Sequence, residues 1–296
     1  MKFKKFKGVI PALVTPLNAD ESINTSALSK LIEHLIEKKA DGFYIGGATG
    51  EGHNLRPSER KILAESAVSA INGRVPSIIQ VASTDFSCAV DLAKHAESIG
   101  ADAISATAPI FFSYDEEDVY NYYKRLAGSV NIPLMVYYCP AANFKMSAEF
   151  AKRLFEIDNV TAIKWTSSDY YGMLKLHDIT NGEMNIVNGF DEMLIMGLSA
   201  GADVGIGTTY NFMFKTIKSI YTSFKNGDIE GALAYQTMAD RVIHVFHKYK
   251  AIPATKVILE KMGFDVGNAT FPMKRYTDEE KQRLIHEMET AGLEFN

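Results

Sequence analysis

Residues 100–107, Gly-Ala-Asp-Ala-Ile-Ser-Ala-Thr, contain the signal that decides the fold. A glycine suits the left-handed conformation that often ends a helix, and the short run after the aspartate is typical of a buried strand. The same order returns at residues 201–206, and Lys-Ala-Asp at residues 39–41 is a variant of it. A helix end joined directly to a strand start, repeated along the chain, predicts β/α units.

Short β-rich runs alternate with longer segments of helical period, at a spacing of roughly 25–30 residues. Thr25, Pro57 and Ser147 suit the starts of three of the helices. Eight parallel strands that alternate with helices close into a barrel, so we predict an α/β fold, a (β/α)8 TIM barrel. The strands are expected at residues 9–14, 42–46, 77–82, 103–107, 134–138, 162–165, 185–188 and 204–206, and the three helices at residues 26–39, 58–72 and 148–156.

Residues 211–296 follow the eighth strand without a Pro- or Gly-rich linker. We therefore expect a barrel at residues 1–210 and a C-terminal helical layer at residues 211–296, packed together as a single structural unit. His244 and His247 lie one helical turn apart, but no third metal ligand is near them in the sequence, which favours a solvated or core-edge pair over a metal site. The helices of this layer are expected at residues 212–225, 229–249, 254–262 and 278–291.

The composition excludes several classes of protein. A chain of 296 residues that is 47% hydrophobic can bury a large core. The net charge of −5 is spread without a basic block, so no nucleic-acid partner is expected. No apolar stretch has membrane-spanning length, and the lysine-rich N-terminus lacks the apolar segment of a signal peptide. With only two cysteines, we expect a cytoplasmic protein with no disulfide framework and no membrane partner.

Lys164 carries the most chemical information. It lies in residues 161–166, Thr-Ala-Ile-Lys-Trp-Thr, a run that is otherwise typical of a buried strand. Burying an ammonium is costly unless it is paired or loses its charge, and a neutral amine is a nucleophile. Lys164 either forms a Schiff base with a carbonyl substrate or lies at a strand end and extends into solvent. This segment by itself leaves both readings open.

The active site of such a barrel lies at the carboxyl ends of its strands. Five predicted strands end in residues that can bind or transform a ligand, although each also has a structural explanation as a turn, a helix cap or a core side chain. Their occurrence at one end of one barrel favours a site. These residues are Ala48, Thr49 and Gly50 after the second strand, Tyr137 in the fifth, Lys164 and Thr166 in the sixth, Gly189, Asp191 and Glu192 after the seventh, and Gly207 and Thr208 after the eighth.

With these residues the chain resembles, over essentially its whole length, the N-acetylneuraminate lyase and dihydrodipicolinate synthase family of class I aldolases. Gly46–Glu51 resembles the family's carboxylate-binding loop Gly-Gly-x-Thr-Gly-Glu, Tyr137 matches its catalytic tyrosine and Lys164 its Schiff-base lysine. The resemblance implies a lyase that acts on a 2-keto sugar acid and releases pyruvate. It also implies that no metal or organic cofactor is needed, and that the chain assembles as a homotetramer.

Two segments favour the sialic acid lyase branch of the family. Residues 189–192, Gly-Phe-Asp-Glu, resemble the motif whose acids hold the glycerol tail of the sugar, and residues 205–211 resemble a second motif, with Thr208 in place of a serine. Ala142 stands where dihydrodipicolinate synthases carry an arginine, which argues against their reaction. The branch implies cleavage of N-acetylneuraminate to N-acetylmannosamine and pyruvate.

Two positions depart from the family pattern. Ala48 replaces a Ser or Thr, and Phe111 lies where the family has tyrosines, so both hydroxyl partners of Tyr137 in a proton relay are missing. The departures keep open another 2-keto-3-deoxy sugar acid aldolase or a dehydratase, and a non-catalytic module that binds 2-keto acids. Candidates to replace the missing hydroxyls are water, Thr49, Tyr114 and Tyr138.

Overall fold

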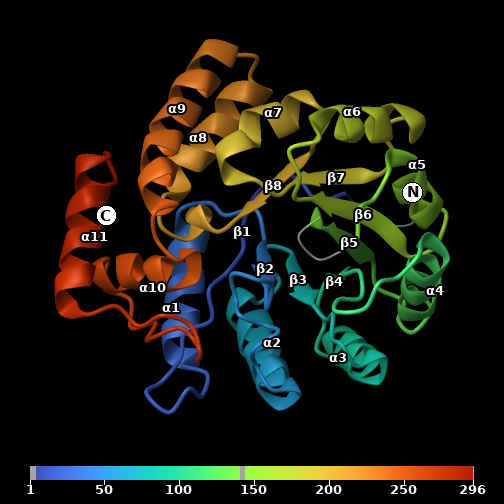
Figure 1. Ribbon diagram of the computed structural model, residues 1–296, viewed down its shortest axis with the longest axis horizontal. Coiled ribbons are helices and arrows are strands. Elements are labelled where there is room, and N and C mark those ends of the chain that lie inside the picture. The colour runs from blue at the N-terminus through green and yellow to red at the C-terminus, as the bar shows by residue number, and fades with distance from the viewer. Residues whose placement is uncertain (1–4, 141–143, 296) are drawn as a thin grey trace.

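The computed structural model describes residues 5–140 and 144–295, and eight parallel strands of this part of the chain form a barrel (Figure 1). The predicted fold class is confirmed. The strands follow the order β1-β8-β7-β6-β5-β4-β3-β2, and an Ala12–Tyr44 bridge joins the two ends. The strands are β1 (Gly8–Pro11), β2 (Phe43–Ile45), β3 (Ser77–Gln80), β4 (Ala103–Thr107), β5 (Leu134–Tyr138), β6 (Val160–Trp165), β7 (Asn185–Asn188) and β8 (Val204–Gly207).

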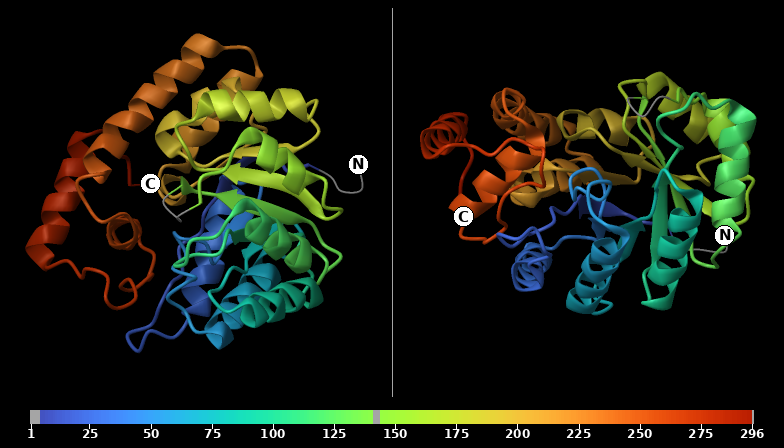
Figure 2. Two further views of the ribbon diagram at one scale, coloured as in Figure 1. Left: turned by 45° about the vertical axis from the view of Figure 1, so that its right-hand side comes forward. Right: turned by 60° about the horizontal axis from the view of Figure 1, so that its bottom comes forward.

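A helix follows each strand and lies on the outside of the barrel (Figures 1 and 2). The helices cover the outer face of the parallel sheet, because the strands of such a sheet are apolar on both faces and both faces are buried. The outer helices are α1 (Thr25–Glu37), α2 (Pro57–Ile71), α3 (Phe86–Ser98), α4 (Glu116–Ala127), α5 (Ala148–Phe155), α6 (Tyr170–Ile179), α7 (Leu194–Ser199) and α8 (Phe214–Lys225).

The joints between helices and strands have the geometry that the sequence repeat predicts. Gly100 and Gly201 have φ angles of 83° and 96°, and Lys39 adopts the same left-handed conformation with φ 70°. The Ser147 side chain caps α5 by accepting a hydrogen bond from the Phe150 N–H at 3.1 Å. These local signals therefore end and start the elements where expected.

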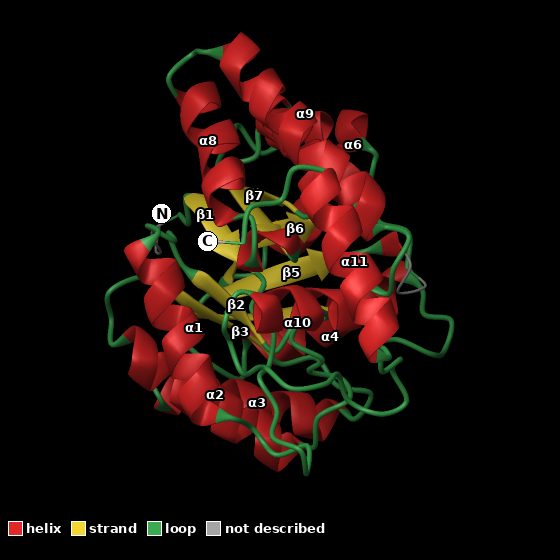
Figure 3. Ribbon diagram, turned by 90° about the vertical axis from the view of Figure 1, so that its left-hand side faces the viewer, coloured by secondary structure: helices red, strands yellow, loops and turns green. Residues whose placement is uncertain are grey.

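The predicted layer at residues 211–296 divides in the structure, because α8 covers the barrel as its eighth outer helix. The other three helices, called the C-terminal layer from here on, lie along one flank of the barrel (Figures 1 and 3). They are α9 (Ile229–Phe246), α10 (Ala251–Lys261) and α11 (Asp278–Thr290). The start predicted for α10 at residue 254 was wrong by three residues. Pro253 lies in the first turn of α10, where a missing N–H removes no intrahelical hydrogen bond.

The layer touches the barrel through main-chain and side-chain contacts. The Leu17 N–H donates to the Val266 carbonyl at 3.0 Å, and the rings of Phe212 and Phe246 lie 5.5 Å apart. The division of the chain at residue 210 stays a prediction.

In the part of the chain that the structure describes, no helix has both the length and the apolar character needed to cross a membrane.

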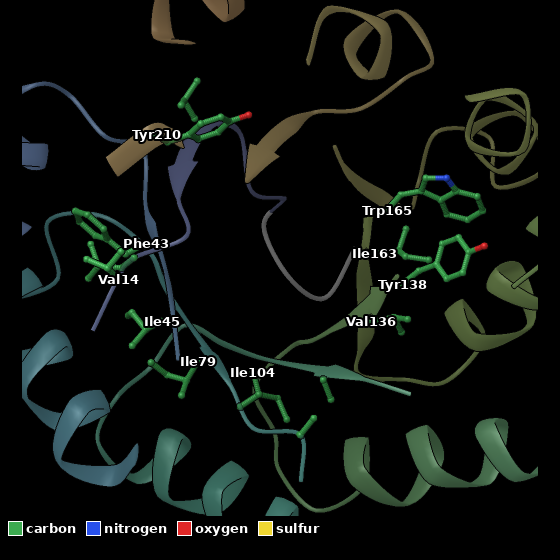
Figure 4. Close-up of a cluster of buried hydrophobic side chains, with 14 of the residues drawn as sticks. Val14, Phe43, Ile45, Ile79, Ile104, Val136, Tyr138, Ile163, Trp165 and Tyr210 are labelled. Carbon is green, nitrogen blue, oxygen red and sulfur yellow. The ribbon is translucent and has the colours of Figure 1, made fainter. Parts of the chain in front are cut away.

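Strand alternation separates the side chains of the barrel into two sets. Val136, Tyr138, Ile163 and Trp165 point away from the barrel axis and pack in the main core beneath the helices (Figure 4). Their neighbours along the strands therefore point inward. Lys164, between two outward residues, faces the interior of the barrel.

Ile163→Ala should lower the free energy of unfolding by about 2–5 kcal/mol, because it leaves a cavity at a site that is 0% exposed. Urea denaturation would measure the change. The matched variant Ile62→Ala, at a side chain that is 45% exposed, should change stability by less than about 1 kcal/mol. Equal losses for both variants would contradict the assignment of the outer core.

Candidate active site

A cavity of about 240 Å³ opens at the carboxyl ends of the strands. Of the candidate residues from the sequence, only Gly50 is not among its lining residues. The Gly50 carbonyl instead accepts a hydrogen bond from the Thr15 hydroxyl at 2.6 Å. The candidates that line the cavity are Ala48, Thr49, Tyr137, Lys164, Thr166, Gly189, Asp191, Glu192, Gly207 and Thr208.

Lys164 lies in this cavity with 5% of its surface exposed. Its Nζ atom lies 4.3 Å from the centre of the Tyr137 ring and 4.9 Å from the centre of the Tyr44 ring. The amine makes no hydrogen bond or ion pair with any residue that the structure describes. Lys164 therefore does not extend into solvent.

Tyr137 stands beside Lys164 in the sheet, since the two residues are paired across β5 and β6. Its ring meets that of Tyr44 edge to face, with centroids 6.2 Å apart. The Tyr44 hydroxyl donates to the Ser105 hydroxyl at 3.0 Å, and burial, followed by the nearby Tyr137, raises the pKa of Tyr44 above its ordinary range. Tyr44 is therefore a wall of the site, and Tyr137 is the phenol available for proton transfer.

The candidates for the missing relay hydroxyls occupy different places. Tyr138 packs against Trp165 on the outer face of the sheet, with ring centroids 4.5 Å apart, so it is remote from the interior (Figure 4). Tyr114 lines another hollow, next to Arg125. Thr49 does line the cavity, and its Oγ1 lies 2.7 Å from the Thr208 Oγ1. Thr49 is the one of these three side chains that can contact a ligand beside Lys164.

Asp191 is tightly held within the site. Its Oδ2 accepts hydrogen bonds from the Thr209 N–H at 2.8 Å and the Thr209 hydroxyl at 2.7 Å. A Cβ atom at Gly207 would lie 1.8 Å from the other carboxylate oxygen, so only glycine allows this approach. Burial raises the pKa of Asp191 to about 6 against the opposing effect of the Thr209 hydrogen bonds. Two bonds already occupy one oxygen of this carboxylate.

Glu192 differs from its neighbour. Its side chain is partly exposed and lines the cavity, and its carboxylate accepts no hydrogen bond from the residues that the structure describes. A carboxylate with free lone pairs can accept two hydroxyl donors from a ligand. Glu192 is therefore better placed than Asp191 to bind a hydroxylated ligand directly.

Sequence reasoning missed the part of the cavity wall that comes from the C-terminal layer. Ile243, Phe246, His247 and Ala251 face the barrel strands across the cavity. Period-two alternation in β2 could have identified Tyr44, but nothing local to α9 or α10 indicates which of their residues reach the site. Ala142, which stands where dihydrodipicolinate synthases carry an arginine, lies outside the described residues.

The two histidines at the C-terminal end of α9, His244 and the C-cap residue His247, do not share one site. His247 lines the cavity, whereas His244 lines a separate groove between α9 and α11. Among the described residues, no group of three His, Cys, Asp or Glu side chains is arranged to hold a metal ion.

Asp191→Asn should stabilise the protein above about pH 6 and have little effect at pH 4. The carboxyl pKa of about 6 in the folded protein exceeds the ordinary value of 3.8, so its ionisation costs stability as the pH rises through 6. That difference corresponds to about 3 kcal/mol, while the Asn oxygen can still accept from Thr209. Urea denaturation from pH 4 to pH 8 would measure it, and a stability difference independent of pH would contradict the prediction.

Comparison with known proteins agrees with this geometry. Residues 5–291 match the model of the dihydrodipicolinate synthetase family. An N-acetylneuraminate lyase of Clostridium perfringens strain SM101 is 34% identical over 284 residues, which are 95% of this chain and 98% of that protein. An N-acetylneuraminate lyase of Rhizobium meliloti is 33% identical over 271 residues, with 92% and 90% of the two chains covered.

Solved structures are similar over the whole barrel. CdNal from Clostridium difficile, in complex with mannosamine, superimposes with a TM-score of 0.93 and 32% identity, covering 97% of this chain and all of that one. N-acetylneuraminate lyase from Mycoplasma synoviae gives a TM-score of 0.91 and 30% identity over 99% of this chain and 100% of that one. The resemblance inferred from the glycine loop, the tyrosine and the lysine is confirmed, and the chain belongs to the dihydrodipicolinate synthetase family.

Proposed function

We propose that the protein is a class I aldolase that cleaves N-acetylneuraminate to N-acetylmannosamine and pyruvate. The observation that carries this proposal is the buried amine of Lys164, without a hydrogen-bond partner among the described residues and 4.3 Å from the ring of Tyr137. The names of the relatives from Clostridium perfringens and Rhizobium meliloti support the choice of substrate.

The first step joins Lys164 to the substrate. The Nζ lone pair attacks the C2 ketone of the 2-keto acid, and loss of water leaves an imine, which is protonated. The substrate carboxylate lies against Ala48 and Thr49, where backbone N–H groups and the Thr49 hydroxyl can donate to it. Fixing the carboxylate orients C2 toward the amine.

Carbon–carbon cleavage follows from the imine. The C4 hydroxyl loses its proton, a C4 carbonyl forms, and the C3–C4 bonding electrons flow into the protonated imine to give an enamine. Tyr137 mediates the proton transfer, since it is the phenol next to Lys164 whose ring faces the interior. Protonation of the enamine at C3 and hydrolysis of the imine then release pyruvate and restore the amine.

The tail of the sugar binds at the far end of the cavity. Glu192 accepts hydrogen bonds from the tail hydroxyls, Thr208 adds a hydroxyl, and Thr166 and Gly189 complete the wall. The Thr166 Oγ1 is buried without a hydrogen-bond partner among the described residues, so a bound hydroxyl can satisfy it. Asp191 holds the loop after β8 through Thr209 and shapes this end of the site.

A second candidate function keeps the same chemistry with another 2-keto-3-deoxy sugar acid. It is favoured by Ala48, which supplies no hydroxyl to the cavity, and by Phe111, which is 80% exposed with a φ of 84°.

We further propose a cytoplasmic homotetramer. The free thiols Cys88 and Cys139 are compatible with a reducing compartment, and the exposed rings of Phe111 and Phe112 are suited to an interface between copies.

Lys164→Met should abolish pyruvate release from N-acetylneuraminate, because no amine remains to form the imine. Borohydride reduction in the presence of pyruvate should add mass to the wild-type protein at Lys164 and none to the variant, as measured by mass spectrometry. Lys215→Met, at an exposed lysine, should leave both results unchanged. A wild-type protein that forms no adduct would falsify the Schiff-base mechanism.

Glu192→Ala should impair long substrates more than short ones, because the lost carboxylate contacts only the tail. In the condensation direction with pyruvate, kcat/KM should fall at least about tenfold with N-acetylmannosamine and much less with glyceraldehyde. Glu230→Ala, at an exposed residue of α9, serves as the control. Equal losses for the two aldehydes would remove Glu192 from the tail site.

A further inference from the structure

The turn at residues 48–51 presents Ala48 and Thr49 to the cavity and ends in a residue under backbone strain. The Glu51 N–H donates to the Ala48 carbonyl at 3.1 Å and closes the turn. Glu51 has a φ of 57°, in the left-handed region that glycine favours. A glutamate kept in this conformation needs contacts outside the turn to hold it there.

Those contacts come from the C-terminal part of the chain. The Glu51 Oε1 lies 2.7 Å from the Nζ of Lys256 in α10, in an ion pair whose side chains are 0% and 2% exposed. The Glu51 Oε2 accepts hydrogen bonds from the Thr270 N–H at 2.6 Å and the Thr270 hydroxyl at 2.9 Å. Lys256 in turn donates to the Asn268 carbonyl at 2.9 Å. Both oxygens of the carboxylate are therefore held by residues far away in the sequence.

The charge of Lys256 is essential to this arrangement. The Glu51 Oε1 is buried and accepts no hydrogen bond of normal geometry from a described residue, so attraction to the ammonium is what stabilises it. Burial lowers the pKa of Lys256 against the opposing attraction of Glu51. Removing either partner leaves an uncompensated buried charge, which the site can avoid only by rearranging.

The barrel supports the same turn at two other points. Thr15 donates to the Gly50 carbonyl, and the Thr208 hydroxyl lies 2.7 Å from that of Thr49. Neither contact reaches Glu51. The strained end of the turn is therefore connected to α10 and to the segment around Thr270, and not to the strands.

We propose that Glu51 and Lys256 are positioning residues that orient the turn at Ala48 and Thr49 toward the carboxylate of the 2-keto acid. This inference rests on the proposed function and adds the C-terminal layer to the binding of the substrate carboxylate. Neither Glu51 nor Lys256 is among the residues that line the cavity, so both act through the turn and not by contact with substrate. A ketone without a carboxylate makes no use of this orientation.

The test compares pyruvate with methyl pyruvate, which has the same ketone and no free carboxylate. The readout is the fraction of Lys164 trapped by borohydride at increasing ketone concentration, measured by peptide mass spectrometry. In Glu51→Gln and Lys256→Met, the pyruvate concentration that gives half trapping should rise at least tenfold. The value for methyl pyruvate should stay within about twofold of wild type. A loss that is equal for both ketones, or no loss for pyruvate, would overturn the proposal.

Three further variants separate positioning from stability. Glu51→Gln/Lys256→Met should be no worse than the poorer single variant, because a neutral amide needs no ammonium. Thr270→Val, which keeps the ion pair and removes one hydrogen bond to Glu51, should raise the pyruvate concentration two- to threefold and gives a milder variant if the charge variants do not fold. Lys281→Met, which breaks the exposed Lys281–Glu260 ion pair of the same layer, should change neither ketone.

The wild-type protein separates this proposal from the aldolase assignment. If it forms no adduct with either ketone, the aldolase function fails and the positioning role fails with it. If it forms the pyruvate adduct and the charge variants match it at every concentration, the aldolase function stands and the positioning role is overturned.

Discussion

A primary amine buried inside a closed barrel is the constraint on which the site depends. Lys164 is 5% exposed and contacts the faces of two tyrosines, and its amine makes no hydrogen bond or ion pair with a described residue. Such a group lowers stability, since a buried polar group without a partner is costly. The barrel tolerates this cost because the helices on its outer face bury a large apolar core.

The two acids of the site differ from the amine of Lys164 in their burial and hydrogen bonding. Asp191 is buried, its pKa is raised to about 6 by that burial, and two donors from Thr209 compensate part of the cost. Glu192 remains partly exposed and free to accept hydrogen bonds. Adjacent residues of one motif therefore have different roles. Asp191 fixes the loop after β8, and Glu192 faces the ligand.

The C-terminal layer contributes to the site in two ways. Residues of α9 and α10 form one wall of the cavity, and Lys256 of α10 holds the carboxylate of Glu51 beneath the turn at residues 48–51. The layer is therefore more than a cover for the barrel. Its packing decides the shape of the far end of the cavity and the position of the turn next to Lys164.

Much of the fold could be predicted from the sequence, because its signals are local. The Gly-Ala-Asp joints, the first-turn proline and the strand periodicity act over a few residues, and the structure bears them out at Gly100, Gly201 and Ser147. Alternation around Lys164 also suffices to turn it inward once the strand is recognised. The start of α10 was predicted three residues late, and the structure places Pro253 in its first turn.

The sequence by itself therefore determined the barrel, the family resemblance and the lysine and tyrosine at its mouth. Only the tertiary structure decided which hydroxyls stand near them: Thr49 lines the cavity with Thr208, whereas Tyr138 lies outside the barrel against Trp165. It also decided that Glu51 pairs with Lys256, 205 positions away along the chain (256 − 51). The physical reason is that such contacts depend on how helices pack across the barrel. No local pattern of residues indicates which residues, far apart in the sequence, will meet in the fold.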